Sequence, residues 1–159
     1  MTGVSDAEKR IKVLEEEIEK LRDIETIKNL KYRYWRCVDN RLWDELADCF
    51  TEDASVDYGF GIQLNGRRAI KKFFIMIVGQ RFSESMHQGH NPEIEVTGKS
   101  ARGRWQIDQF GIESKTGKAV RIGGIYVDEY VKDGDGWRIK KSTKERYNYR
   151  YTLDMEEFE

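Results

Sequence analysis

Hydrophobic residues recur at helical spacing through roughly the first forty positions, among residues that form helices readily. Intervals of three, four and three residues separate the first apolar positions, which places them in one narrow stripe on a helix. The stripe spans fewer than three heptads, and it packs either on its own domain or against a partner subunit. Its members are Ile11, Leu14, Ile18 and Leu21.

Two further features divide this helical region. Asp23 precedes a renewed run of apolar positions, so it can act as an N-cap and divide the region into two helices near Arg22. Asn40 is a residue type that ends helices in a left-handed conformation. A short second helix is then expected from about Leu42 to Phe50.

Alternating patterns and turn residues replace the helical spacing after about residue 54. Residues 54–58 and 62–64 read as short strands, and Asn65-Gly66 is a dipeptide that often joins paired strands. Helical spacing returns over residues 67–78, where Gly79 is expected to end a third helix.

The remaining chain reads as long strands with tight connections, which predicts an antiparallel meander. Helices first and a sheet afterwards place the chain in the α+β class rather than among βαβ folds. The expected long strands cover residues 86–96, 101–113, 120–131 and 137–151.

Length and charge narrow the class of protein. A chain of 159 residues fits one domain, which buries about 70% of the surface that its unfolded chain exposes. The 28 basic and 29 acidic residues are interspersed, so no global field favours nucleic acid or an anionic membrane. No stretch approaches the length of a membrane span, and no apolar signal region follows the first charges. We therefore expect a soluble, cytoplasmic protein.

Cysteine usage gives no sign of a disulfide framework or a zinc site. Cys37 and Cys49 lie twelve residues apart without a CxxC motif or a histidine-rich neighbourhood. Both are expected to pack against helices.

The residues after Asp23 resemble the opening of SnoaL-like proteins, a branch of the NTF2-like superfamily. This resemblance rests on DIETIKNL from Asp23, YWRCVD ending at Asp39, LWDEL from Leu42 and FTEDA ending at Ala54. It implies a cone-shaped, curved antiparallel sheet with N-terminal helices around an apolar pocket. Residues 23–159 would form this domain, behind a helical extension over residues 1–22.

Within that group the chain resembles the bacterial bile-acid 7α-dehydratases. The similarity rests on YWRCVDNRLWDEL, MHQGHNPEI, GRWQID and the pair Trp137 and Arg146. Scytalone dehydratase and the lindane dehydrochlorinase are more distant relatives in which an Asp at the end of the first long helix meets a strand His. The resemblance implies Asp39 and His87 as this dyad.

The same resemblance implies Tyr34 as a hydroxyl acid in the pocket and Arg146 as a cationic partner in the last strand. One departure from the dehydratase pattern concerns the acidic residue after GRW. The pattern has it one place later than Asp108, where this chain has Gln109. Because a shift of one residue turns a strand side chain to the other face, the position of Asp108 decides its role.

Physical chemistry gives Asp39 two possible partners. A carboxylate at a helix C-terminus is disfavoured by the macrodipole by about 0.3–1 kcal/mol. Arg41 can offset this cost as a solvated surface pair. His87 can offset it as an imidazole that the carboxylate orients to act as a base.

His87 and His90 are the only histidines, and three residues apart on a strand they should face opposite sides of the sheet. Only one of them is then expected to point into the pocket, and both can also be ordinary polar strand residues. Opposite faces argue against a two-histidine metal site, so we expect no metal and no cofactor.

Other pocket residues have alternatives as well. Tyr32 competes with Tyr34 as the pocket hydroxyl, and either can be a core aromatic residue. Arg146 lies among tyrosines of the last strand, where it forms an exposed ladder or anchors an anionic group. The residues expected to contact substrate are Trp35, Phe60, Trp105, Phe110, Arg146, Asp108 and His90.

The leading hypothesis is a cofactor-independent lyase, a dehydratase for a polycyclic, steroid-like or aromatic hydroxy-ketone, with His87 as the base. One alternative keeps the dyad but changes the reaction to isomerisation, polyketide cyclisation or dehydrohalogenation. Another is a module that binds a ligand or a partner without catalysis. We expect a small hydrophobic polycyclic substrate, no nucleic acid, and a homodimer or homotrimer.

Overall fold

The computed structural model describes residues 5–134 and 136–153. Helices come first, and four long strands follow. The elements in chain order are α1 (Asp6–Asp39), α2 (Trp43–Asp48), β1 (Phe50–Asp57), β2 (Gln63–Asn65), α3 (Arg67–Phe73), the π-helical segment η1 (Phe74–Val78), α4 (Gly79–Arg81), β3 (Phe82–Thr97), β4 (Ser100–Glu113), β5 (Ala119–Asp133) and β6 (Gly136–Leu153).

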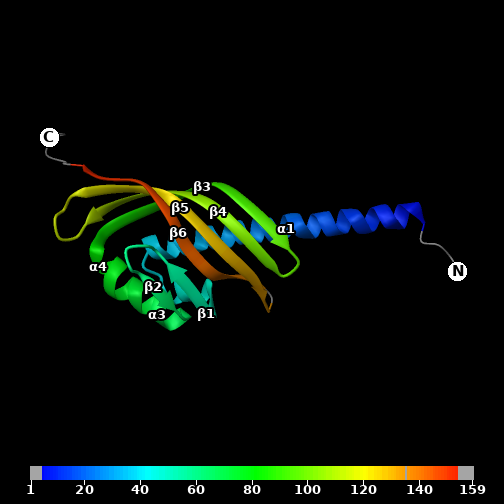
Figure 1. The fold of residues 1–159 in the computed structure, drawn as a ribbon, viewed down its shortest axis with the longest axis horizontal. Coiled ribbons are helices and arrows are strands. Elements are labelled where there is room, and N and C mark those ends of the chain that lie inside the picture. The colour runs from blue at the N-terminus through cyan, green and yellow to red at the C-terminus, as the bar shows by residue number, and fades with distance from the viewer. Residues whose placement is uncertain (1–4, 135, 154–159) are drawn as a thin grey trace.

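One curved sheet in the order β2-β1-β6-β5-β4-β3 contains all of these strands. The strands β3 to β6 form the expected antiparallel meander. The expectation of a wholly antiparallel sheet needs correction, because β1 pairs with β6 in parallel. Strand β6 is the last strand of the meander, and it lies beside β1 and runs in the same direction as β1. In Figure 1 the sheet curves over α1, and α3 and α4 lie beside its concave side.

Helix α1 is a single helix of 34 residues. It begins with a capping box, in which the Ser5 side chain accepts from the Glu8 amide and the Glu8 carboxylate accepts from the Ser5 amide. The break expected near Arg22 does not occur. Asp23 is a buried tertiary contact rather than an N-cap, because its carboxylate accepts hydrogen bonds from Trp137 Nε1 (2.8 Å) and Lys132 Nζ (3.1 Å).

The end of α1 differs from the expectation by one residue. Asn40 has φ −96°, and Arg41 instead takes the left-handed conformation at φ 57°. The Arg41 guanidinium Nη2 donates to the carbonyl oxygens of Phe82 (2.6 Å) and Ser83 (2.9 Å). These two bonds tie the helix end to the beginning of β3 and compensate for the strained backbone.

Two expectations about the region around Gly66 also change. Asn65-Gly66 does not join paired strands, since β1 and β2 are connected through residues 58–62. Gly66 is instead the N-cap of α3, with φ 89° and an amide that donates to the Ala54 carbonyl oxygen. Gly79 does not end the following helix, because its φ of −65° is helical and the chain continues to Arg81.

A buried polar network lies inside the otherwise apolar core. Lys31 and Asp128 form an ion pair of 2.6 Å, and both side chains are inaccessible to solvent. Asp128 also accepts from the hydroxyls of Tyr130 (2.9 Å) and Ser142 (2.6 Å). Tyr130 in turn accepts from Trp105 Nε1 at 2.9 Å.

As expected, Cys37 and Cys49 are free and buried against the helices. Among the described residues, no helix combines the length and apolar composition that crossing a membrane requires.

Candidate active site

A mostly apolar pocket of about 370 Å³ opens between the concave face of the sheet, the end of α1 and the segment from α3 to α4. This volume lies within the range typical of small-molecule sites, about 300–1,000 Å³. Its lining residues are Tyr34, Val38, Tyr58, Phe60, Ile62, Phe73, Phe74, Ile77, Val78, Arg81, Phe82, His87, Gln109, Ile122, Tyr126 and Lys144.

Asp39 and His87 meet at the wall of this pocket. The Asp39 Oδ1 atom lies 2.5 Å from His87 Nδ1 and accepts from the Ser85 hydroxyl at 3.0 Å. The Asp39 Oδ2 atom accepts from the His87 backbone amide at 2.9 Å. The expected contact between the carboxylate and the imidazole is therefore confirmed, and Arg41 donates to carbonyl oxygens of β3 instead.

The sheet topology explains why the end of a helix reaches this histidine. Strand β3 is the last strand of the sheet, so alternate amides along it point away from β4. Asp39 is the final residue of α1, and its carboxylate occupies that edge at the His87 amide. The hydrogen bonds to Asp39 also supply the compensation that a carboxylate at a helix C-terminus requires.

This geometry fixes the chemistry of the His87 ring. A carboxylate accepts hydrogen bonds, so the contact favours the tautomer with the proton on Nδ1. In neutral imidazole Nε2 is then the basic nitrogen. When Nε2 takes up a proton, Asp39 stabilises the imidazolium that forms.

Two tyrosine hydroxyls face each other in the same pocket. Tyr34 is 2% exposed, and its oxygen lies 3.0 Å from the hydroxyl oxygen of Tyr58. Burial, followed by the neighbouring Tyr58 and Tyr126, raises the pKa of Tyr34 well above its ordinary value. Tyr34 therefore remains a neutral phenol that can donate a hydrogen bond at neutral pH.

The pocket also contains a cationic side chain from the last strand. Lys144 pairs across the sheet with Tyr126, and its ammonium lies 5.4 Å from the Tyr126 ring centroid. Burial, followed by the nearby charge of Arg81, lowers the pKa of Lys144 to about 8. A bound anion or carbonyl oxygen would favour the charged form of this lysine.

The buried Lys31–Asp128 pair lies directly behind the pocket tyrosines. Lys31 Nζ is 4.5 Å from the ring centroid of Tyr34 and 4.6 Å from that of Tyr126. These cation-π contacts fix the rings from the side of the core. Burial lowers the pKa of Lys31, and the charge of Asp128 opposes this effect.

The aromatic residues expected in the pocket wall divide between wall and core. Phe60 lines the pocket, with 85% of its surface exposed. Trp35 and Trp105 are instead core residues, 3% and 0% exposed, whose rings meet edge to face at 5.4 Å. Both rings are buried in the core, and neither lines the pocket.

Four other expected contact residues lie on the outer face of the sheet. Asp108 binds Arg121 through Nε at 3.0 Å, and Phe110 is opposite Arg121 in the strand register. His90 is exposed, and so is Arg146, whose partner Ile125 alternates with Tyr126. The strand period turns all four away from the pocket, and Gln109 takes the inward position beside Asp108. His87 and His90 face opposite sides, as predicted.

Three further residues that line the pocket are not among those predicted from the sequence, namely Tyr58, Gln109 and Lys144. Tyr58 directly follows β1, where only alternation of side chains could have indicated an inward position. For Gln109 there is a signal in the sequence, because it stands where the dehydratase pattern has its acidic residue. The inward position of Lys144 could not be predicted from the sequence. The pairing of β6 with β5 contains register shifts, so strict alternation from the preceding turn does not tell which side chains of β6 point inward.

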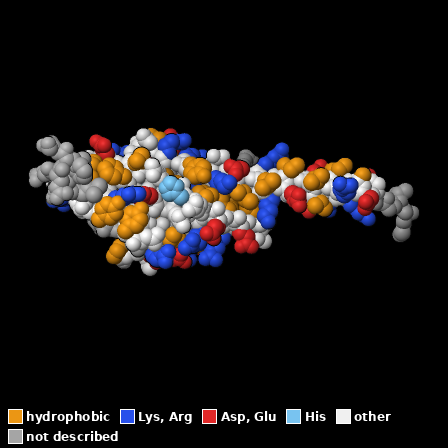
Figure 2. All heavy atoms as spheres, turned by 90° about the horizontal axis from the view of Figure 1, so that it is seen from above, with side chains coloured by type: hydrophobic (Ala, Val, Ile, Leu, Met, Phe, Trp, Pro, Cys, Tyr) orange, Lys and Arg blue, Asp and Glu red, His pale blue; other side chains and the backbone are white. Residues whose placement is uncertain are grey.

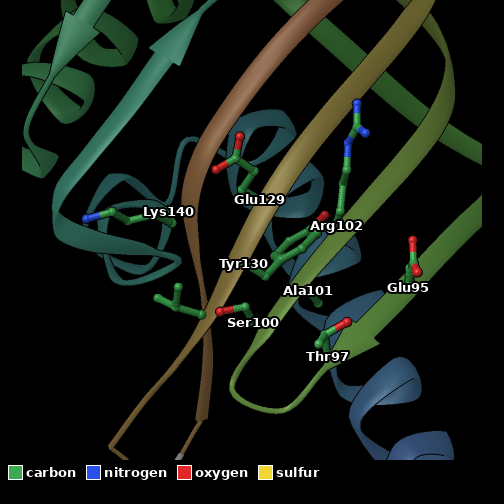
Figure 3. A pocket seen from close by; sticks show the side chains of 9 residues that line it. Glu95, Thr97, Ser100, Ala101, Arg102, Glu129, Tyr130 and Lys140 are labelled. Carbon is green, nitrogen blue, oxygen red and sulfur yellow. The ribbon is translucent and has the colours of Figure 1, made fainter.

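A second depression lies near the turn between β3 and β4 and contains none of these residues. It is shallow, with a volume of about 280 Å³, and Figure 3 shows its Arg102 and Lys140 side chains pointing in different directions. No cluster of three or more His, Cys, Asp or Glu side chains suited to a metal occurs in the part of the chain that the structure describes.

Solved structures with the same fold include a dehydrochlorinase and a candidate dehydratase. The chain matches hexachlorocyclohexane dehydrochlorinase from Novosphingobium barchaimii with a TM-score of 0.80 and 22% identity, over 86% of this chain and 94% of the other. It matches a candidate scytalone dehydratase from Novosphingobium aromaticivorans with a TM-score of 0.78 and 25% identity, over 85% and 90%. These similarities confirm the α+β cone of the NTF2-like superfamily.

Sequence comparison leads to the same group. An uncharacterized protein of Mycobacterium tuberculosis is 30% identical over 115 residues, which cover 71% of this chain and 78% of that protein. The family model of the SnoaL-like domain matches residues 19–143, which is most of the chain. The chain therefore belongs to the SnoaL-like domain family.

Proposed function

We propose that this protein is a cofactor-independent lyase that dehydrates a polycyclic, steroid-like or aromatic hydroxy-ketone. The observation that carries the proposal is the Asp39–His87 pair at the wall of an apolar pocket that also holds the Tyr34 and Tyr58 hydroxyls. A base and hydrogen-bond donors around one cavity are what proton abstraction next to a carbonyl requires.

The proposed reaction begins when His87 Nε2 removes a proton from the carbon beside the substrate carbonyl. The electron pair of the broken C–H bond forms an enolate, whose oxygen accepts a hydrogen bond from the Tyr34 phenol. Collapse of the enolate forms the C=C bond and breaks the C–O bond to the leaving hydroxyl. The proton on His87 passes to that oxygen, so the products are an unsaturated ketone and water, and the enzyme is unchanged.

The base His87 and the hydrogen-bond donor Tyr34 would each contribute to the rate. General base catalysis by a positioned side chain contributes about 10²–10⁴-fold to the rate. Removal of one donor to an oxyanion costs about 10²–10³-fold in other enzymes. The similarity in fold to a dehydrochlorinase and a candidate dehydratase supports an elimination, since both reaction types begin at a carbon acid.

The test compares the two histidines, because the chain provides a matched control. His87→Ala should lower the turnover of a hydroxy-ketone by at least about 10²-fold, whereas His90→Ala on the outer face should leave it unchanged. Substrates are screened by the ultraviolet absorbance of the conjugated ketone product. If His87→Ala and wild type bind the same ligands equally and neither turns them over, the protein is a binding module instead.

A further inference from the structure

The first half of α1 projects away from the domain and leaves its apolar stripe uncovered. In Figure 1 this segment, blue in the ribbon, extends beyond the sheet, and the first buried residue of the helix is Asp23. Figure 2 shows hydrophobic side chains in a row along it, with charged side chains beside them. The stripe residues are Ile11 (54% exposed), Leu14 (55%), Ile18 (47%) and Leu21 (62%).

These exposures decide between packing of the stripe on its own domain and contact with another subunit. The stripe does not fold back on its own domain, because every residue from Ser5 to Arg22 is exposed. The stripe stops at Leu21, just before the helix enters the domain. The stripe is therefore confined to the projecting segment, as expected for a surface that binds another molecule.

We propose that this segment forms a parallel, two-stranded coiled coil with the same segment of a second copy. The spacing allows one heptad assignment, with Ile11 and Ile18 at a and Leu14 and Leu21 at d. A β-branched residue at a with Leu at d favours two parallel strands over three or four.

The flanking charges favour the parallel orientation. Arg10 and Glu17 occupy g positions, and Glu15 and Arg22 occupy e positions. In a parallel dimer each g residue faces the e residue five positions later in the partner chain. Arg10 then faces a second Glu15, and Glu17 faces a second Arg22, so each contact joins opposite charges. An antiparallel arrangement that stacks the same a and d layers would not form these pairs.

The short length of the coiled coil is compensated by the fold. An isolated two-heptad helix is marginal in water because forming the first helical turn is unfavourable. Here the helix is already nucleated, since its C-terminal half is packed in the domain and its N-terminus carries the Ser5–Glu8 capping box. Association needs only to cover the stripe.

The first experiment measures the mass of the full chain by sedimentation equilibrium. The Ile11→Lys/Ile18→Lys variant should have half the mass of wild type at the same concentration, and should fold normally because both residues are exposed. Val13→Lys is the matched control. Val13 lies on the same helix with 54% exposure but at position c, away from the stripe, so its substitution should leave the mass unchanged.

The second experiment reads the orientation. Ile11→Cys alone should form an intermolecular disulfide on mild oxidation, because equal a positions meet only in a parallel dimer. The native Cys37 and Cys49 are buried, so wild type should not cross-link under the same conditions. An antiparallel pair would cross-link only when Leu21→Cys is added.

Charge reversal tests the e and g pairs separately. Arg10→Glu or Glu15→Arg alone should weaken dimerisation about fivefold, and the two together should restore it. The proposal is overturned if the Lys double variant keeps the wild-type mass, if Ile11→Cys does not cross-link, or if the mass is that of a coiled-coil trimer which only the stripe variants disrupt.

Discussion

The indole ring of Trp35 occupies the space that a side chain at Gly89 would need. A Cβ atom added to Gly89 would lie 1.9 Å from Trp35 Cζ3, and the ring is held from behind by Trp105. Gly89 is two residues beyond His87 on the same face of β3. The close approach of this strand to α1 therefore brings His87 to Asp39.

Gly89→Ala should force Trp35 or the strand to move. We expect a loss of about 1–3 kcal/mol in the free energy of unfolding, as for other overpacked cores, together with reduced turnover because His87 shifts. Gly136→Ala is the control, since a Cβ there meets nothing within 4 Å. Urea denaturation of the two variants gives the comparison, and equal midpoints would mean that the indole moves aside without strain.

Asp39 and His87 should act as one unit. Asp39→Asn and His87→Ala should each lower the turnover number by at least about 10²-fold with little change in ligand affinity. The double variant should be scarcely slower than His87→Ala alone, because residues that act together are strongly non-additive. Additive losses in a double-mutant cycle would show independent roles.

The two pocket hydroxyls should differ from tyrosines elsewhere on the sheet. Tyr34→Phe should lower the turnover number by about 10²–10³-fold, since the side chain no longer donates to the developing oxyanion. Tyr149→Phe, on the outer face near Arg121, should have no effect on turnover. An unchanged rate in Tyr34→Phe with a lower melting temperature would assign Tyr34 to the core alone.

Lys144 should give the protein a measurable dependence of stability on pH. Its pKa is about 8 in the folded protein and 10.5 in the reference state, so between these values the unfolded chain binds the extra proton. Stability contributed by this group therefore rises as pH increases from about 8 to about 10.5. Allowing for partial solvent access, we expect a rise of about 1–2 kcal/mol, which is absent from Lys144→Met. Parallel slopes for both proteins would contradict the assignment.

Lys31 should be far more important for stability than a surface lysine on the same helix. Lys31→Met leaves Asp128 buried without its cation and should lower the free energy of unfolding by about 3–5 kcal/mol. The hydrogen bonds that Tyr130 and Ser142 donate to Asp128 reduce this loss. Lys28→Met removes an exposed pair with Glu25 and should cost less than about 0.5 kcal/mol. Calorimetry of the two variants makes the comparison.

Helix and strand order, and the dyad, could be predicted because each depends on local spacing or on a matched motif. The pocket lining could not be predicted as well, because it depends on which face of each strand turns inward. Asp108 and Gln109 are neighbours with opposite orientations, and the bulges of β6 change the count again before Lys144. Such offsets arise from tertiary packing and have no signature in residue spacing.

The hydrogen bond from the His87 amide to Asp39 also affects the solubility of the fold. An outermost strand offers unpaired amides to any other extended chain, which is a common route to aggregation. Asp39 places a negative charge on that edge and takes up one of its donors. An alanine at position 39 would remove the hydrogen-bond partner of His87 and also leave its backbone amide open to strand addition by another molecule, whereas asparagine would keep the edge covered.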